Sequence, residues 1–260
     1  MAHNLLLSSK AQALADAGVE RALYELAKPE TDLRRWKADG LRREFEMGGA
    51  KIAVTVTDES GKIDLNSAQD TLLKAALASC GLNEEQVSTV MDAILDWRDP
   101  DSLKRSRGAE EDEYRAAGKK FRPSNGPFEI LEEMQHVIGV TPNLYAKIAG
   151  ILTVYSKLPG INPALASREV LQAIPQLEAT QLEAYLSQRQ QNLERDLPPP
   201  PFPVAASYLL QSNSQVVGIR SEALLADGTQ FVREAVVKAT SGGNRPYHFF
   251  RWVEGIVKEK

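Results

Sequence analysis

The chain has 260 residues, 43% of them hydrophobic and 25% charged, which is typical of a globular protein with room for one large domain or two modest ones. A formal net charge of −4 argues against general attraction to nucleic acid or anionic lipid. The single cysteine, Cys80, excludes an intramolecular disulfide, and neither a signal peptide nor a stretch of about 18 apolar residues is visible.

The N-terminal region is predicted to be a helix followed by a hairpin. Over residues 8–28 apolar side chains recur at intervals of three and four, and Pro29 ends the pattern. The hairpin consists of two alternating runs, 41–47 and 50–57, joined by the pair Gly48-Gly49. The apolar stripe of the helix contains Ala11, Leu14, Ala15, Val19, Ala22, Leu23 and Leu26.

A block of short helices joined by tight turns is predicted from Asn66 to about Gln191. The sequence at 62–76 resembles that at 160–174, and the helices that follow these two segments also match, which predicts a helix-hairpin-helix unit present twice. The proline-rich stretch 196–204 has the composition of a stiff linker and marks the exit from the block.

Strands are predicted again after the linker, with a hairpin turn at Asp227-Gly228. They lie at 207–212, 215–226, 229–239 and 247–257, with a separator at 241–246 before the last. Because the strands on either side of the helical block are too few to form a stable sheet alone, we expect one sheet made from both ends of the chain. The first helix packs on this sheet and the helical block is inserted, which is an α+β fold. The predicted domains are 1–59, with the first helix and strands, 60–195, the inserted helical domain, and 196–260, with the strands that complete the sheet.

The segment from Asp96 to Tyr114 is crowded with like charges. Calcium takes six to eight oxygen ligands, mostly from carboxylates, and a divalent ion would reverse the repulsion within such a cluster. The EF-hand pattern is absent. The sequence leaves open the alternative that nearby basic side chains neutralise the acids in water. The acids are Asp96, Asp99, Asp101, Glu110, Glu111, Asp112 and Glu113, and the basic residues are Arg98, Lys104, Arg105, Arg107 and Arg115.

Other kinds of site have little support. His3, His136 and His248 are far apart in the sequence, which argues against a zinc site. No nucleophile elbow, phosphate-binding glycine loop or H-E-x-x-H motif is present, so we predict that the protein is not an enzyme. A nucleic-acid-binding protein is the alternative, because repeated helix-hairpin-helix units often bind DNA phosphates through backbone amides.

Several longer strings resemble the K-type minor pseudopilins of the type II secretion system, and the resemblance covers most of the chain in the right order. The strings are ALADAGVERALYEL (13–26), DESGKIDLNSA (58–68), ILDWRDPD (94–101), GAEEDEY (108–114), NGPFEILEEMQHVIGVTPNLY (125–145) and LTVYS (152–156). The resemblance implies a pilin-like fold with a large inserted helical domain. It also implies a periplasmic protein that is held in the inner membrane by an N-terminal segment absent from this chain.

The resemblance further implies partners and a cofactor. The expected partners are the I-type and J-type minor pseudopilins, with which the protein would form the tip of the pseudopilus and start its assembly. Secreted substrates and the outer-membrane secretin are further expected contacts, and nucleic acid is not. Calcium is the expected cofactor, in a structural role. Carried over by position, its ligands are Asp99, Asp101, Glu110, Glu111 and Asp112.

Two positions depart from the family pattern. Glu113 stands where the family often has a second aromatic residue, and the second repeat reads INPALAS where the family favours INLNTAS. The contact with partner pilin helices is predicted on the alanine-rich stripe, at Ala11, Ala15, Val19 and Ala22. The alternative is that this whole stripe packs on the chain's own sheet.

Overall fold

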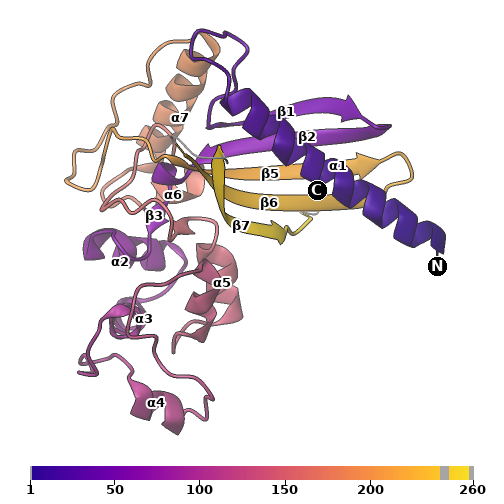
Figure 1. Ribbon diagram of the computed structural model, residues 1–260. Coiled ribbons are helices and arrows are strands. Elements are labelled where there is room, and N and C mark those ends of the chain that lie inside the picture. The colour runs from indigo at the N-terminus through magenta and orange to yellow at the C-terminus, as the bar shows by residue number, and fades with distance from the viewer. Residues whose placement is uncertain (1, 241–245, 258–260) are drawn as a thin grey trace. The chain divides into compact units, whose positions relative to one another are not determined.

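The computed structural model describes residues 2–240 and 246–257 (Figure 1). The chain divides into two compact units, the sheet unit formed by 1–59 with 213–260 and the helical unit formed by 60–212. In the described ranges, no helix is both long enough and apolar enough to cross a membrane. The separator predicted at 241–246 lies outside the described residues except for its last position.

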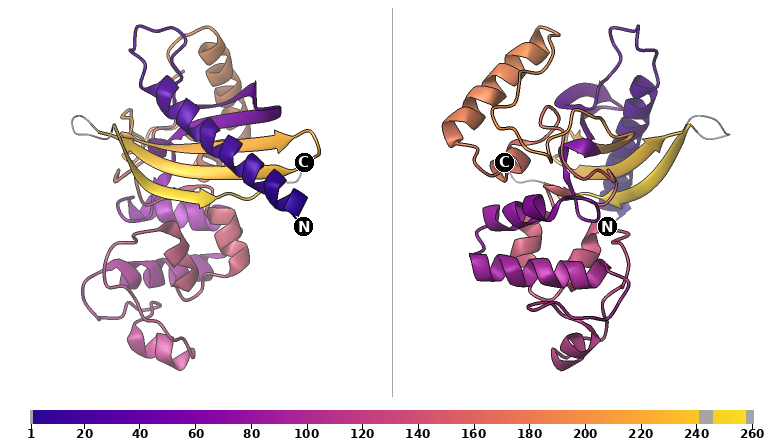
Figure 2. Two further views of the ribbon diagram at one scale, coloured as in Figure 1. Left: turned by 45° about the vertical axis from the view of Figure 1, so that its right-hand side comes forward. Right: turned by 90° about the vertical axis from the view of Figure 1, so that its left-hand side faces the viewer.

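The sheet unit is a five-stranded antiparallel sheet with one long helix on its face (Figures 1 and 2). The strand order is β1-β2-β5-β6-β7, so strands from both ends of the chain join in one sheet, as predicted. The helix is α1 (Ala2–Leu26), and the strands are β1 (Asp39–Met47), β2 (Ala50–Asp58), β5 (Val216–Leu225), β6 (Gln230–Ala239) and β7 (Tyr247–Glu254). Gly48 and Gly49 close the first hairpin with φ angles of 58° and 78°, which glycine adopts at little cost.

The alanine-rich stripe of α1 is buried in the core of the sheet unit. Ala11, Ala15, Val19 and Ala22 are each 0% exposed and pack with Ile52, Val54, Ile219 and Val237 of the sheet. The approach is close, because a Cβ added at Gly18 would lie 2.1 Å from Ser221 Oγ. We therefore correct the predicted partner-binding role of these four residues: small side chains are needed there so that α1 can lie against its own sheet. The apolar surface that α1 leaves exposed is instead at Leu5, Leu6 and Tyr24.

The helical unit is built from short helices around a separate core. Its helices are α2 (Asp70–Ser79), α3 (Glu84–Arg98), α4 (Glu111–Ala116), α5 (Pro142–Ile148), α6 (Arg168–Gln172) and α7 (Ala179–Glu194). Two 3-10 helices, η1 (Glu59–Gly61) and η2 (Leu131–His136), and a parallel pair of two-residue strands, β3 (Ile63–Asp64) and β4 (Leu152–Thr153), complete it. Asn83 begins α3 with a capping box, because its side chain accepts from Gln86 N at 2.9 Å while Gln86 Oε1 accepts from Asn83 N at 3.0 Å.

The strand predicted at 207–212 is wrong. Tyr208 is 7% exposed and belongs to the core of the helical unit, and Leu209 forms only an isolated parallel bridge with Ile161. Ile161 N donates to Tyr208 O at 2.9 Å, and a Cβ added at Gly160 would lie 2.0 Å from that same oxygen. The chain beyond the proline-rich linker therefore stays with the helical unit as far as Ser212, where the sequence-based boundary was 195.

Candidate functional site

The acidic segment predicted from the sequence lies where α3 ends and α4 begins. Asp96 occupies the last turn of α3 and is 0% exposed, and Asp99 is the C-cap residue of the same helix. Trp97, which follows Asp96, stacks on Phe128 with ring centroids 5.9 Å apart and so anchors this turn. Acidic side chains at a helix C-terminus oppose the helix dipole, so this arrangement requires a compensating positive charge.

Arg105 supplies one positive charge from the loop between the two helices. Its Nη1 donates to Asp96 Oδ1 at 2.7 Å and also to Asp99 Oδ2. Its backbone N donates to both Asp96 oxygens, at 3.3 and 3.2 Å. These two carboxylates raise the pKa of the Arg105 guanidinium further above its usual value. The loop is therefore folded over Asp96 and held there by main chain and side chain together.

Glu110, the N-cap residue of α4, is the group that Arg105 does not reach. It is 7% exposed, and its Oε1 is buried without a hydrogen-bond partner, as is Asp99 Oδ1. Burial, and then the nearby carboxylates of Asp96, Asp99, Asp101 and Glu113, raise its pKa to about 7 from an ordinary value of 4.5. We call Asp96, Asp99, Asp101 and Glu110 the acid cluster.

The structure brings together only part of the predicted ligand set. Asp99, Asp101 and Glu110 belong to the acid cluster, but Glu111 and Asp112 point into ion pairs on the outer side of α4. Arg115 contacts both at 2.8 Å, and their side chains are 53% and 87% exposed. Asp96 was not among the predicted ligands. Its position in the sequence nevertheless indicates burial, because it falls within the buried stripe of α3, between Ile94 and Trp97.

The alternative that basic residues neutralise the loop is realised at some of the predicted positions. Lys104 Nζ lies 2.7 Å from Glu113 Oε1, in addition to the Arg105 and Arg115 pairs. Arg98 instead donates to the backbone oxygen of Leu65 at 2.5 Å. Over the described part of the chain, no group of three or more His, Cys, Asp or Glu side chains is already arranged to hold a metal ion.

The acid cluster nevertheless has the donor chemistry of a site for a hard cation. Its two unpartnered oxygens, Asp99 Oδ1 and Glu110 Oε1, are buried acceptors that a divalent ion favouring carboxylate oxygens would satisfy. A cavity of about 270 Å³ lined by Asn66, Leu95, Arg98, Asp99, Arg105 and Pro127 adjoins the cluster. Asp99 is the one acidic residue of this lining, and the side chains of Arg98 and Arg105 line the cavity with it.

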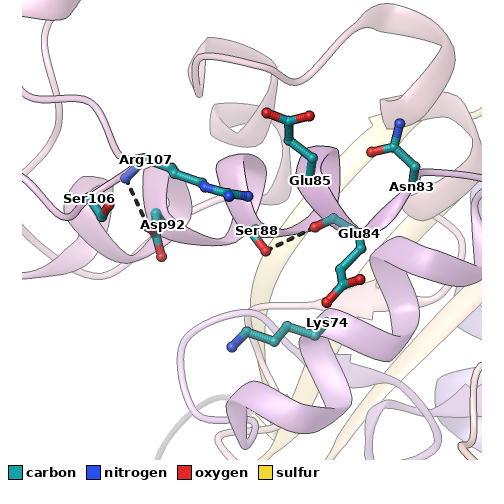
Figure 3. A pocket seen from close by; sticks show the side chains of 8 residues that line it. All are labelled: Lys74, Asn83, Glu84, Glu85, Ser88, Asp92, Ser106 and Arg107. Atoms are coloured by element: carbon teal, nitrogen blue, oxygen red, sulfur yellow. Dashed lines mark hydrogen bonds between the residues drawn. The ribbon is translucent and has the colours of Figure 1, made fainter.

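The residues after Arg105 line a second, open pocket of about 710 Å³ (Figure 3). Its lining is polar: Lys74, Asn83, Glu84, Glu85, Ser88, Asp92, Ser106 and Arg107. Arg107 N donates to Asp92 Oδ2 at 3.1 Å, and Figure 3 shows the Arg107 side chain extending along α3 toward Ser88. One loop thus carries Arg105 into the acid cluster and forms a wall of this pocket.

Gly108 lets the loop close on Asp96, and an alanine there is expected to destabilise the protein by about 1–3 kcal/mol through overpacking. The added Cβ would lie 1.9 Å from Asp96 Oδ2, which Arg105 and burial hold in place. Urea denaturation of Gly108→Ala checks this result. The matched control is Gly150→Ala, because an added Cβ there has no neighbour within 4 Å. Equal stability of the two variants would contradict the close packing of the loop.

Comparison with known proteins finds a family that part of the chain resembles. The family model described as "Type II secretion system (T2SS), protein K" matches residues 53–157, which include the entire acid cluster. Residues 53–157 are therefore similar to protein K of the type II secretion system. The matched segment begins in β2 and ends just after β4.

Two curated relatives carry the same family name. Type II secretion system protein K of Pectobacterium carotovorum subsp. carotovorum is 25% identical over 130 residues, which cover 44% of this chain and 39% of that protein. The protein of the same name from Pseudomonas aeruginosa is 24% identical over 151 residues, covering 54% of this chain and 45% of that protein. The chain thus matches less than half the length of either relative.

A solved structure shares the fold over nearly the whole chain. It is the crystal structure of the GspK-GspI-GspJ complex from the type 2 secretion system of enterotoxigenic Escherichia coli. The likeness has a TM-score of 0.63 at 18% sequence identity, and covers 97% of this chain and 96% of that chain. It supports the predicted α+β class, a pilin-like helix and sheet with an inserted helical domain.

Proposed function

We propose that this chain is the periplasmic part of a minor pseudopilin that forms the tip of the type II secretion pseudopilus with the I-type and J-type minor pseudopilins. The observation that carries the proposal is the fold: sheet unit and helical insertion together match a chain of the GspK-GspI-GspJ complex over 97% of this chain. The role is structural and uses no catalysis. In the full-length protein, an N-terminal segment would anchor this part in the inner membrane.

The connection of the two units suits an assembly protein. The helical unit is inserted between β2 and β5, which are hydrogen-bonded neighbours in the sheet, with Asp58 opposite Val217 at the insertion point. The pilin-like sheet therefore remains continuous although 60–212 are inserted into it. A subunit of this design can keep a packing surface like that of the other pseudopilins while carrying an additional domain. In the proposed role, that additional bulk stops further subunits from adding above the tip.

Calcium is the proposed structural cofactor of the helical unit. The residues that would hold it are those of the acid cluster, of which Asp99 and Glu110 carry the two unpartnered oxygens. Glu111 and Asp112, which the family resemblance implies as ligands, would first have to leave their pairs with Arg115. A bound divalent ion would supply the positive charge that the end of α3 lacks and hold the loop against it.

The proposed function is tested by mixing the purified chain with the soluble I-type and J-type minor pseudopilins of the same secretion system. Size-exclusion chromatography with light scattering is expected to show one complex containing all three proteins in equal amounts. Binding to duplex DNA that weakens steeply with salt would instead favour the nucleic-acid alternative, for which the comparisons give no support. Failure to form any complex with either pseudopilin would refute the proposal.

A further inference from the structure

Arg105 behaves as a cation built into the acid cluster. Its guanidinium contacts one oxygen of Asp96 and one of Asp99, and Asp99 also lines the cavity beside the cluster. The partner carboxylates are deeply placed, since Asp96 is 0% and Asp99 18% exposed, whereas the Arg105 side chain is 37% exposed. Arg105 is therefore the member of this group that can move into solvent while the carboxylates stay in place.

The guanidinium compensates the cluster only partly. Arg105 donates to only two of the four carboxylates of the acid cluster, and the oxygens Asp99 Oδ1 and Glu110 Oε1 keep no hydrogen-bond partner. A planar, single-charge donor cannot reach all these acceptors at once. A divalent ion carries twice the charge and accepts six to eight oxygens around it, so it can satisfy acceptors that Arg105 leaves unpaired.

We propose that Arg105 is an internal competitor of the divalent cation: it holds the loop closed on the acid cluster when no ion is bound, and it must leave Asp96 and Asp99 when the ion enters. The proposal rests on the calcium site put forward above. An ion bound to Asp99 Oδ1 would share the Asp99 carboxylate with the Arg105 guanidinium, which holds Asp99 Oδ2, and like charges a few ångströms apart repel strongly at a site shielded from water. Occupation of the site is therefore an exchange of Arg105 for the ion.

The exchange also reaches the second pocket. Ser106 and Arg107 follow Arg105 directly and form part of the pocket wall, and Arg107 N is hydrogen-bonded to Asp92. Displacement of Arg105 removes the side-chain anchor of this loop and leaves its backbone hydrogen bonds to Asp92 and Asp96. The shape of the pocket lined by Arg107 is thus expected to differ between the ion-free and the ion-bound protein.

The test is calorimetric titration of calcium into the wild type, Arg105→Gln and Arg107→Gln, each stripped with chelator first. The apparent calcium affinity is proportional to the fraction of molecules in which the site is free to bind. Arg105→Gln removes the competing state and is therefore expected to bind calcium about tenfold more tightly or better. Arg107→Gln is the matched control: it removes the same charge from the same loop, but the Arg107 side chain is not among the contacts of the acid cluster. Its affinity is expected to change less than about twofold, since exposed charges are screened.

Limited trypsin digestion gives an independent readout without calcium. The loop contains Lys104 and Arg107 as remaining cleavage sites in Arg105→Gln. In chelator this variant is expected to be cut in the loop several times faster than the wild type, and addition of calcium is expected to restore protection. Arg105→Lys, which keeps the charge but replaces the guanidinium with a more strongly hydrated ammonium, is expected to fall between the two.

The outcomes separate this inference from the proposals on which it builds. Calcium binding by the wild type with equal or weaker binding by Arg105→Gln would overturn the exchange, because Arg105 would then support the ion or ignore it. Absence of calcium binding in every variant would overturn both the exchange and the calcium site. Neither result would touch the role at the pseudopilus tip, which is tested by complex formation with the I-type and J-type proteins.

Discussion

Glu110→Gln is expected to stabilise the calcium-free protein by about 3 kcal/mol at pH 7.5 and above, and to abolish most of its stabilisation by calcium. The carboxylate is 7% exposed among other carboxylates, which raise its pKa to about 7, so its ionised form is costly in the folded state. Glutamine keeps the shape and removes the charge. Thermal unfolding in chelator and in calcium measures both effects, and a substitution that stabilises one state while weakening the other distinguishes a cation site from a merely buried acid.

The same group predicts how stability changes with pH. The ordinary pKa of 4.5 applies to the unfolded chain and the pKa of about 7 to the folded one, so folding takes up a proton between these values. The free energy of unfolding of the calcium-free protein should therefore fall as pH rises from about 4.5 to about 7 through the contribution of Glu110. Calcium favours the ionised carboxylate and should reverse this trend. Urea denaturation across this range, with and without chelator, measures the two slopes.

Glu111→Gln is the matched control for Glu110→Gln. Glu111 is the adjacent residue of the same type, but it is 53% exposed and paired with Arg115 and Arg122. Surface substitutions of this kind usually change stability by less than about 0.5 kcal/mol. If Glu111→Gln removed the calcium response while Glu110→Gln did not, the ligand set implied by the family resemblance would be right and the assignment to the acid cluster wrong.

The site shows which parts of such an arrangement can be predicted from sequence. The crowding of carboxylates between two helices is visible directly, and Asp99, Asp101 and Glu110 do gather there. Residue spacing alone does not determine which way the side chains in the first turn of a six-residue helix point. The side chains of Glu111 and Asp112 pair with Arg115, one turn later in the same helix. For Asp96, the residue type alone predicts nothing, but the helical periodicity of α3 places this position on the buried face. A carboxylate on a buried face needs a partner.

The fold shows a similar division between local pattern and tertiary contact. The alternation of β2 and the glycine pair before it specify a hairpin locally, and that prediction is confirmed. The run at 207–212 contains three successive apolar residues, but they belong to the helical unit, where Tyr208 packs in the core and Gly160 leaves room for its carbonyl. A short apolar run indicates burial, but it does not indicate which element of the fold covers it.

The alanine stripe of α1 carries the second large effect. Ala15→Arg is expected to destabilise the sheet unit by about 4 kcal/mol or more, because Ala15 is 0% exposed against the sheet and an arginine would be buried without a partner and without space. An unfolding curve followed by Trp36 and Trp252, the tryptophans of the sheet unit, measures this loss. Replacing Trp97 with phenylalanine in both backgrounds keeps the helical unit out of the signal.

Ala13→Arg distinguishes a core position from a partner contact. Ala13 lies two residues away on the exposed side of the same helix, so arginine there should change stability by less than about 0.5 kcal/mol. If the stripe serves the sheet, Ala15→Arg loses binding to the I-type and J-type proteins only in step with loss of folding. If Ala15→Arg kept the wild-type unfolding curve and yet failed to bind the I-type and J-type proteins, the stripe residues Ala11, Ala15, Val19 and Ala22 would contact the partners after all. Comparison of Ala13→Arg with Ala15→Arg therefore tests whether the small residues of this helix are needed for packing on the chain's own sheet or for contact with partner proteins.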